Sequence, residues 1–455
     1  MPLEPLASSP CAAYNPYVTP DPHSTKTSVT SIFQQRLRPL CRDPRTVGPT
    51  TRLASLLFTL IVLVVTACGP RPQPTPESAF RAAKTPRLSD DLDLRQLVTA
   101  IDAQRGALVR KPEKPMRFGP TVVSQRAYAK ALDRLATELR SPSTTEEKLA
   151  YIQDHFDFYE TYGRESWGEI LLTSYFEPVI RGSHSRTKAF SQPLYARPKD
   201  LLTVPLAPFS QRFQGEGSLK GRVQQDRVMP YFSREEIDGG GALKGRGLEL
   251  AWVDPIDAFF LQIQGSGTIN FGGSAREHLV YADKNGHAYV PVGKFLKEKI
   301  APNPVTMQAI VDELKNMSPR ERDALLFKNP SYVFFARSKQ RAVTSLGVPA
   351  TPGRTVAADP AFSPKGALAF VSFSKPTFSH AEPSDTVPAS SEEVGRFVLD
   401  QDSGGAITGT GRIDLFWGRG EDAGRYAGAL QDSARIWYLV PKDLGEPVPD
   451  NPGQP

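Results

Sequence analysis

Residues Asp400 to Lys442 form the sequence DQDSGGAITGTGRIDLFWGRGEDAGRYAGALQDSARIWYLVPK, in which two short apolar runs flank glycines. This pattern is typical of a strand, a turn and a second strand. Alternation along the second strand places Asp414 and Phe416 on the same face. A carboxylate beside aromatic residues on a strand is costly unless it is paired, hydrogen-bonded or used in catalysis. From the residues alone, a structural role for Asp414, such as pairing with Arg412, and a catalytic role both remain open.

Three aspartates, Asp359, Asp402 and Asp414, lie near glycine or proline turns. Carboxylates in this setting suit metal binding, acid catalysis on glycosidic bonds, or the capping of turns. Histidine and cysteine partners are missing from the pattern, so we expect no metal. We also expect no cofactor, because Gly265-Ser266-Gly267 lacks the following lysine that a phosphate-binding loop requires.

Length and charge limit the class of protein. The chain has 455 residues, too many for one hydrophobic core, so two or more domains are expected. A net charge of +6 is weakly compatible with an acidic polymer or an anionic surface. Nucleic acid is not favoured, because the sequence has no basic helix, zinc-ligand spacing or aromatic RNA-binding motif.

The amino end predicts a lipoprotein signal. Residues 1–46 are rich in proline, serine and threonine, and we interpret them as disordered or as a mis-annotated start. Within residues 47–68, the apolar run Leu53–Val65 follows a basic residue and leads through small residues to Cys68. This order is typical of a secretory signal, and a cysteine directly after small residues is the bacterial lipobox pattern. The predicted site of lipidation is therefore Cys68.

The next segments predict a tether followed by helices. Residues 69–114 begin with a proline-rich stretch and are interpreted as the tether. Apolar spacing predicts a helix over Val122–Leu139. A capping sequence at Ser143–Glu146 predicts a second helix, with Phe156 and Tyr159 on its apolar face.

The middle and the end of the chain predict mostly strands. Phe259–Gly267 is interpreted as a strand, which would put Gln262 and Gln264 on one face. The composition of residues 374–393 predicts a loop. A helix over Glu421–Leu430 and a last strand over Arg435–Val440 complete the expected fold, and the tail, residues 443–455, is predicted to be disordered.

Five ordered segments carry a family resemblance: Leu172–Pro178, Glu249–Asp254, Phe259–Gly267, Asn329–Phe335, and Asp402–Ile407 together with Gly411–Gly418. These segments resemble the membrane-bound lytic murein transglycosylase A family. The resemblance extends over roughly residues 115–442, and its last part is similar to the three-aspartate domain.

The resemblance implies a mainly β fold. A double-psi β-barrel domain with N-terminal helices would be built from residues 115–180 and 330–442. A second, smaller inserted β-domain would occupy residues 181–329. A glycan strand would bind in a groove between the two domains.

The resemblance also implies a reaction and its residues. The β-1,4 bond between N-acetylmuramic acid and N-acetylglucosamine would be cut by attack of the muramic C6 hydroxyl on C1, which leaves a 1,6-anhydro end. The family's catalytic aspartate maps to Asp414, acting first as acid and then as base, and a supporting aspartate maps to Asp402. Substrate contacts are expected from Thr173, Ser174, Tyr175, Gln262, Gln264, Ser266 and Asp359. Ser174 stands where glycine is expected, which affects the fine contacts rather than the reaction.

The expected partners are peptidoglycan strands and, through the lipid, a membrane. Gly69 rather than aspartate follows Cys68, which by resemblance to bacterial lipoproteins favours the periplasmic face of the outer membrane. Two alternatives remain: a murein-binding lipoprotein without catalysis, and a true hydrolase that uses both Asp402 and Asp414. The sequence gives no indication of protein partners.

Overall fold

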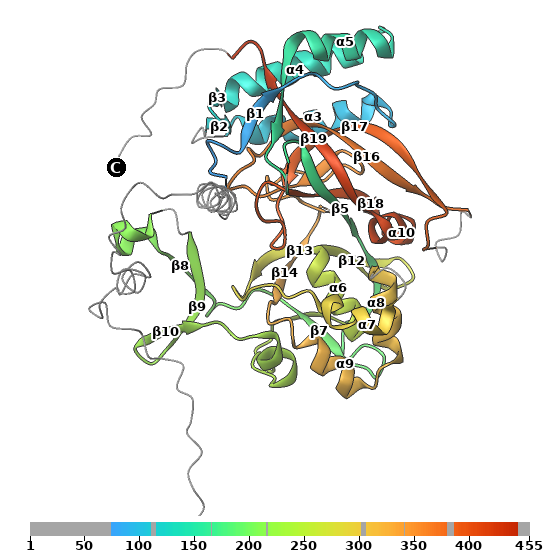
Figure 1. The fold of residues 1–455 in the computed structure, drawn as a ribbon. Helices are drawn as coiled ribbons and strands as arrows, with labels where there is room; N and C mark the ends of the chain where they lie inside the picture. The colour runs from blue at the N-terminus through green and yellow to red at the C-terminus, as the bar shows by residue number, and fades with distance from the viewer. Residues whose placement is uncertain are drawn as a thin grey trace, which may run out of the picture. The chain divides into compact units, whose positions relative to one another are not determined.

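The computed structural model describes residues 74–110, 115–164, 166–214, 217–301, 306–340, 342–379 and 386–444 (Figure 1). The predictions for the disordered start, the signal and Cys68 lie outside these ranges, as does nearly all of the predicted tail. The described residues belong to one compact unit, Gln73–Pro455. Within the described ranges, no helix combines the length and the apolar character that crossing a membrane requires.

A closed six-stranded barrel carries the segment around Asp414. Its order is β19 (Gln431–Pro441), β16 (Ala367–Thr377), β17 (Ser390–Asp402), β15 (Thr355–Ala357), β18 (Arg412–Arg419) and β5 (Glu169–Glu177). Pairing of β5 with β19 closes the barrel, and β4 (Phe156–Thr161) and β1 (Phe80–Ala83) continue the sheet beyond β19. The pairs β5–β18 and β15–β17 are parallel, as expected for a double-psi barrel. The predicted mainly β fold with this barrel is confirmed.

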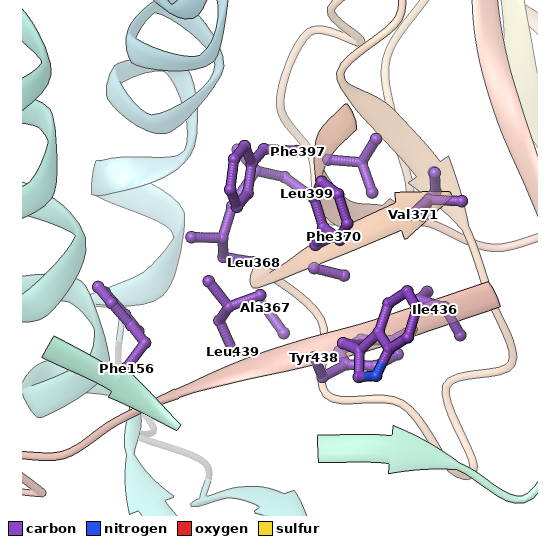
Figure 2. Packing of buried hydrophobic residues seen from close by; sticks show 14 of the residues in the cluster. Phe156, Ala367, Leu368, Phe370, Val371, Phe397, Leu399, Ile436, Tyr438 and Leu439 are labelled. Carbon is purple, nitrogen blue, oxygen red and sulfur yellow. The ribbon is translucent and has the colours of Figure 1, made fainter. Parts of the chain in front are cut away.

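The N-terminal helices share one core with the barrel. They are α3 (Leu94–Leu108), α4 (Gln125–Arg140) and α5 (Thr145–His155), with the hairpin β2 (Pro115–Phe118) and β3 (Thr121–Ser124) before α4. Phe370 and Phe397 are fully buried in this core with ring centres 5.1 Å apart, and Figure 2 shows the two rings side by side. Tyr128 on α4 donates a hydrogen bond to the carbonyl of Leu439 at 2.7 Å, which ties the helix to β19.

The predicted tether does not hold for residues 80–108, because β1 and α3 lie there. The side chain of Asp93 accepts a hydrogen bond from the N–H of Arg95 and caps α3. Leu97, Ile101 and Leu108 along this helix are buried in the main core. Apolar spacing after an N-capping aspartate is the signal that would have indicated this helix.

A buried ion pair fixes the chain just before α3. The guanidinium of Arg354 is fully buried, and its two terminal nitrogens donate to Asp90 Oδ2 at 2.6 Å and Oδ1 at 3.0 Å. The same nitrogens donate to the carbonyls of Phe397 and Asp93 at 2.8 and 3.0 Å. Because Arg354 precedes β15 and Phe397 lies on β17, this pair joins the N-terminal segment to the barrel.

The inserted domain is built on a six-stranded sheet. Its order is β14 (Val333–Ser338), β13 (Ala275–Lys284), β12 (Ser266–Gly272), β6 (Val179–Ser183), β11 (Glu249–Val253) and β7 (Gln192–Tyr195). Only Pro178 separates β5 of the barrel from β6. The strand β14 lies in the stretch that we assigned to the barrel (330–442), yet it pairs with β13 and so belongs to the inserted sheet.

Helices and a small sheet complete the inserted domain. The helices are α6 (Pro255–Gln264), α7 (Lys297–Ile300), α8 (Met307–Asn316) and α9 (Pro319–Leu326), with a π-helical turn at Glu235–Gly239. A separate three-stranded sheet consists of β8 (Leu202–Pro205), β9 (Ser218–Gln224) and β10 (Arg227–Pro230). Figure 1 shows it in green.

The strand that we predicted over Phe259–Gly267 is wrong for residues 259–264, which belong to the helix α6. Asp254 caps this helix by accepting a hydrogen bond from the N–H of Ile256 at 2.8 Å, and Gly265 ends it with φ of 80°. An apolar run of this length does not by itself distinguish a buried helix from a strand. Residues two apart on a helix point to different sides, so Gln262 and Gln264 do not share a face.

Four other element predictions can be compared with the structure. The helix α5 ends at His155, so Phe156 and Tyr159 lie on β4 rather than on a helical stripe. The predicted loop 374–393 is shorter in the structure, because β16 extends to Thr377 and β17 begins at Ser390. The predicted helix near Glu421 is confirmed as α10 (Gly420–Ala429), and the last strand is confirmed as β19.

Candidate active site

Asp414 lies on β18 between β15 and β5, opposite Ala357 and Thr173. Its side chain is 17% exposed. The hydroxyl of Thr173 donates a hydrogen bond to Oδ1, and Nη2 of Arg412 lies 3.5 Å from the same oxygen. Among the described residues no hydrogen bond reaches Oδ2. The protein therefore holds one carboxyl oxygen and leaves the other available for a ligand.

Burial raises the pKa of Asp414 from 3.8 to about 6. The positive charge of Arg412 opposes this rise in pKa, and the negative charge of Asp402 adds to it. An acid with a pKa of about 6 is protonated in about a tenth of molecules at pH 7, against on the order of one in a thousand for an ordinary aspartate. The group can therefore donate a proton and later accept one near neutral pH.

We expect Asp414→Asn to stabilise the folded protein near neutral pH. The folded-state pKa lies above the ordinary value, so the ionised carboxyl is disfavoured by folding. This penalty is absent below pH ~4, grows up to pH ~6 and is constant above it. A rise of some two pKa units limits the gain in unfolding free energy to about 3 kcal/mol, and the altered contact with Thr173 reduces it. Denaturant unfolding of both proteins near pH 4 and above pH ~7 checks this, and an equal gain at both pH values contradicts it.

Asp402 ends β17 close to Asp414 and is held by three donors. Its Oδ2 accepts a hydrogen bond from the hydroxyl of Tyr175 at 2.8 Å. Its Oδ1 accepts from the backbone N–H groups of Ser345 at 2.8 Å and Ser403 at 2.9 Å. Burial and the charge of Asp402 hold the pKa of Tyr175 well above its ordinary value, so this hydroxyl stays a donor. These contacts suit a carboxylate that supports the site rather than one that attacks a sugar.

A half-buried lysine and a second acid, Asp400, lie behind Asp402. Nζ of Lys365 donates to Asp400 Oδ1 and to the carbonyl of Asp402, both at 2.6 Å, and to the carbonyl of Ala358 at 2.8 Å. Asp400 is fully buried and also accepts a hydrogen bond from Tyr438 at 2.9 Å. Burial raises the pKa of Asp400, and Lys365 opposes that rise. The sequence analysis missed Asp400, although an acid at the end of the apolar run Val398-Leu399 was a possible signal.

Asp359 lies in the turn after β15 and caps backbone groups. Its Oδ1 accepts from the N–H of Ala361 at 2.9 Å, and its Oδ2 accepts from the N–H of Gly409 at 2.7 Å. Gly409 belongs to the loop that leads into β18. In the described structure Asp359 therefore holds the loop that precedes Asp414.

Two family models match the chain, one described as the MltA specific insert domain over residues 171–336 and one described as the 3D domain over residues 354–440. The membrane-bound lytic murein transglycosylase A of Vibrio cholerae is 32% identical over 283 residues, which cover 61% of this chain and 67% of that protein. This chain belongs to the membrane-bound lytic murein transglycosylase A family. The family inferred from the five segments is thereby confirmed.

Solved structures of the lytic murein transglycosylase A family agree with the fold. The membrane-bound lytic murein transglycosylase from Agrobacterium tumefaciens gives a TM-score of 0.64 at 26% identity, covering 80% of this chain and 98% of that one. The Escherichia coli MltA solved with bound chitohexaose gives a TM-score of 0.58 at 25% identity, covering 82% of this chain and 97% of that one. The comparison thus extends to both the barrel and the inserted domain.

The glutamines that we expected to contact glycan are both engaged with protein groups. Gln262 is buried, and its Oε1 accepts a hydrogen bond from Nη2 of Arg234 at 2.8 Å. Gln264 accepts from the N–H of Phe176 at 3.0 Å, which links α6 to the end of β5. Ser266 begins β12, where it is paired with Val280. Gln262 and Gln264 thus have protein partners, and contact of these two residues and of Ser266 with a glycan stays a prediction.

The remaining predicted contact residues lie on β5. Thr173 and Tyr175 touch Asp414 and Asp402 respectively, so they belong to the site. Ser174 points to the other face of the strand, where its hydroxyl donates to the carbonyl of Ala427 on α10 at 3.3 Å. Of the three, only Thr173 and Tyr175 are placed to act together with the two aspartates.

The inserted domain adds two residues that the sequence analysis missed. Burial raises the pKa of Tyr289. The charges of Arg412 and Arg234 oppose this rise and the charge of Asp414 adds to it. Nζ of Lys284 lies 3.6 Å from the position that a Cβ on Gly405 would take, beside the loop before β18. No local sequence pattern predicts the approach of Lys284 to Gly405, because the two residues lie far apart in the sequence.

Proposed function

We propose that this protein is a lytic transglycosylase that cleaves peptidoglycan between N-acetylmuramic acid and N-acetylglucosamine and leaves 1,6-anhydro ends. The observation that carries the proposal is Asp414, a mostly buried carboxyl group with a pKa of about 6 and one unoccupied oxygen. The relatives named above are lytic murein transglycosylases, and one of them was solved with chitohexaose.

The proposed first step is protonation of the leaving group. Protonated Asp414 donates from Oδ2 to the glycosidic oxygen, the bond from C1 to that oxygen breaks, and the carboxyl becomes a carboxylate. Thr173 and Arg412 lie against Oδ1, where they stabilise the negative charge as it forms.

In the proposed second step the same carboxylate acts as a base. It takes the proton of the muramic C6 hydroxyl while that oxygen bonds to C1 and closes the anhydro ring. The acid is regenerated and no water is consumed. One carboxyl group suffices, in contrast to glycosidases that use two.

Hydrolysis with Asp402 as second carboxylate is the main competing reaction. Both oxygens of Asp402 already accept hydrogen bonds from protein groups, which makes this carboxylate a poor nucleophile and a poor base for water. Mass spectrometry of murein digested by the purified protein tests the proposal directly. Anhydro-muropeptides support it, reducing muramic ends indicate a hydrolase, and an undigested sacculus indicates a binding lipoprotein.

We expect Asp402→Asn to move the pH profile of the reaction. Removal of the negative charge lowers the pKa of Asp414, so the protonated acid is lost at lower pH. The alkaline limb of kcat/KM should therefore move to lower pH, with a loss of roughly 3- to 10-fold at pH 7 for a shift of up to about one pKa unit. Initial rates on soluble murein fragments across the pH range check this. An alkaline limb that stays in place or moves upward contradicts the electrostatic role.

We further propose that Cys68 carries lipid and anchors the chain to the periplasmic face of the outer membrane. The apolar run and lipobox pattern support this, and the relatives carry the description membrane-bound. In the producing bacterium, Cys68→Ala should abolish incorporation of radioactive palmitate. Labelling of the variant at the wild-type level contradicts the assignment of this cysteine.

A further inference from the structure

Lys284 is a half-buried lysine whose ammonium group lies against the loop that connects the two aspartates of the site. It is the last residue of β13, where it pairs with Val333 on β14. Its Nζ lies 3.6 Å from the position that a Cβ on Gly405 would take. Gly405 is exposed and belongs to the loop between β17, which ends at Asp402, and β18, which carries Asp414. The inserted domain therefore places a positive charge beside the barrel loop that joins the two acids.

Hydrogen bonds fix the backbone directly after Lys284. The next residue, Asn285, is 1% exposed. Its Nδ2 donates to the carbonyls of Phe232 and Pro330, both at 2.9 Å, and its Oδ1 accepts from the N–H of Tyr332 at 2.9 Å. Because strand pairing holds one side of Lys284 and these bonds hold the other, its side chain starts from a rigid position.

The ammonium group of Lys284 has no counter-charge within the described ranges, where no carboxylate oxygen lies within 4.0 Å of its Nζ. The neighbouring Asp283 is paired with Lys220 at 2.7 Å and with Arg197 at 2.8 Å. Both oxygens of Asp402 already accept hydrogen bonds from other groups. A partly desolvated ammonium with three donors and no paired acid favours a ligand that supplies the negative charge.

We propose that Lys284 binds a carboxylate on the N-acetylmuramic acid residues of the glycan and so favours murein over uncharged glycans. N-acetylmuramic acid differs from N-acetylglucosamine by a lactyl ether that ends in a carboxyl group. This group is free in bare glycan, and in peptide-substituted murein it bears a stem peptide with carboxylates of its own. An ammonium group on a flexible stem suits either carboxylate. The inference deepens the proposed function and rests on it, since it requires a murein strand at Asp414.

A second cation on the same loop is already engaged with the catalytic acid. Nη1 of Arg412 donates to the carbonyl of Ala406 at 3.4 Å. Its Nη2 lies 3.2 Å from the hydroxyl of Thr173 and 3.5 Å from Oδ1 of Asp414. The charge of Arg412 therefore serves the carboxylate that forms during the proposed reaction. Lys284 is the cation beside this loop that remains available to a carboxylate of the substrate.

The test compares charged and uncharged glycans on the full-length protein. The charged ligands are soluble murein glycans, bare or carrying stem peptides, and the uncharged one is chitohexaose. Binding is measured by calorimetry in the Asp414→Asn background. Addition of Lys284→Met should lower the ratio of the affinities for murein and for chitohexaose about 3- to 10-fold, the loss expected for one partly exposed charge-assisted hydrogen bond.

Two further variants make the measurement specific to the charge. Lys284→Arg keeps a positive charge and should retain most of the ratio. Lys130→Met removes an exposed lysine on α4 and is the matched control, which should leave the ratio unchanged. Binding of chitohexaose by Lys284→Met shows that this variant is folded.

The ligands also distinguish the two carboxylates. A lower ratio with bare glycan assigns the lactyl carboxylate, and a lower ratio confined to peptide-bearing glycan assigns the stem peptide. An unchanged ratio, or equal losses for murein and chitohexaose, overturns the proposal.

Digestion of murein by the protein without substitutions is followed in parallel. Release of anhydro-muropeptides together with an unchanged ratio contradicts this inference alone. A charge-dependent ratio without any anhydro-muropeptides contradicts the proposed function alone.

Discussion

Asp414→Asn is expected to reduce release of anhydro-muropeptides by about 10³- to 10⁴-fold, the upper part of the range for general acid–base catalysis. The upper part applies because one group performs both proton transfers in the proposed reaction. Asparagine keeps the size of the side chain and an oxygen that can accept from Thr173, so the strand β18 should be preserved. Binding of glycan should therefore persist while turnover is lost.

The measurement is the initial rate of anhydro-muropeptide release, accompanied by binding of chitohexaose to the inactive variant. Asp226→Asn is the matched control, because this carboxylate is 85% exposed and, among the described residues, forms an ion pair only with its neighbour Arg227, at 3.8 Å. The control should keep wild-type turnover. Retention of more than about a tenth of the wild-type rate by Asp414→Asn contradicts the acid–base role and moves attention to Asp402.

Arg354→Met is expected to lower the unfolding free energy by about 3–5 kcal/mol, the usual cost of breaking a buried ion pair from one side. Asp90 would lose both charge-assisted hydrogen bonds in a site where its side chain is 1% exposed. The carbonyls of Phe397 and Asp93 would lose their donors as well. Denaturant unfolding at neutral pH gives the value.

Two comparisons make this stability experiment specific. Arg337→Met removes an exposed pair with Glu277, 53% and 32% exposed, and should cost no more than about 1 kcal/mol. Adding Asp90→Leu to Arg354→Met should recover part of the loss, because no unpaired charge then remains buried. A cost for Arg354→Met as small as that of Arg337→Met means that the segment before α3 is not fixed by this pair.

Local sequence patterns were sufficient to predict β18, the strand that carries Asp414. Glycines mark the turn before β18, and alternation correctly places buried Ile413 and Leu415 on the face opposite Asp414. Closure of the barrel was inferred only from family resemblance. Thr173 and Asp414 touch across 241 residues of sequence, and no local pattern specifies a pairing of that kind.

The differences between the predicted and the observed contacts of polar side chains have a common physical cause. Gln262 was expected to share a strand face with Gln264. Its partner is the buried Arg234, which comes from a different segment of the inserted domain. The sequence left a pairing of Arg412 with Asp414 open, and the guanidinium of Arg412 lies beside Asp414 and Thr173. Which partner satisfies a buried polar group depends on tertiary packing, which a single sequence does not display.

The pairing of β5 with β18 and β19 also determines when the enzyme can exist during its synthesis. The strand β5 comes early in the chain, whereas its two neighbours in the barrel are made last. Such non-local pairing forms slowly and only from a complete chain. A nascent polypeptide that ends after residue 338 contains all six strands of the inserted sheet but no Asp414 and no closed barrel. The proposed catalytic site is thus complete only after synthesis has passed β19.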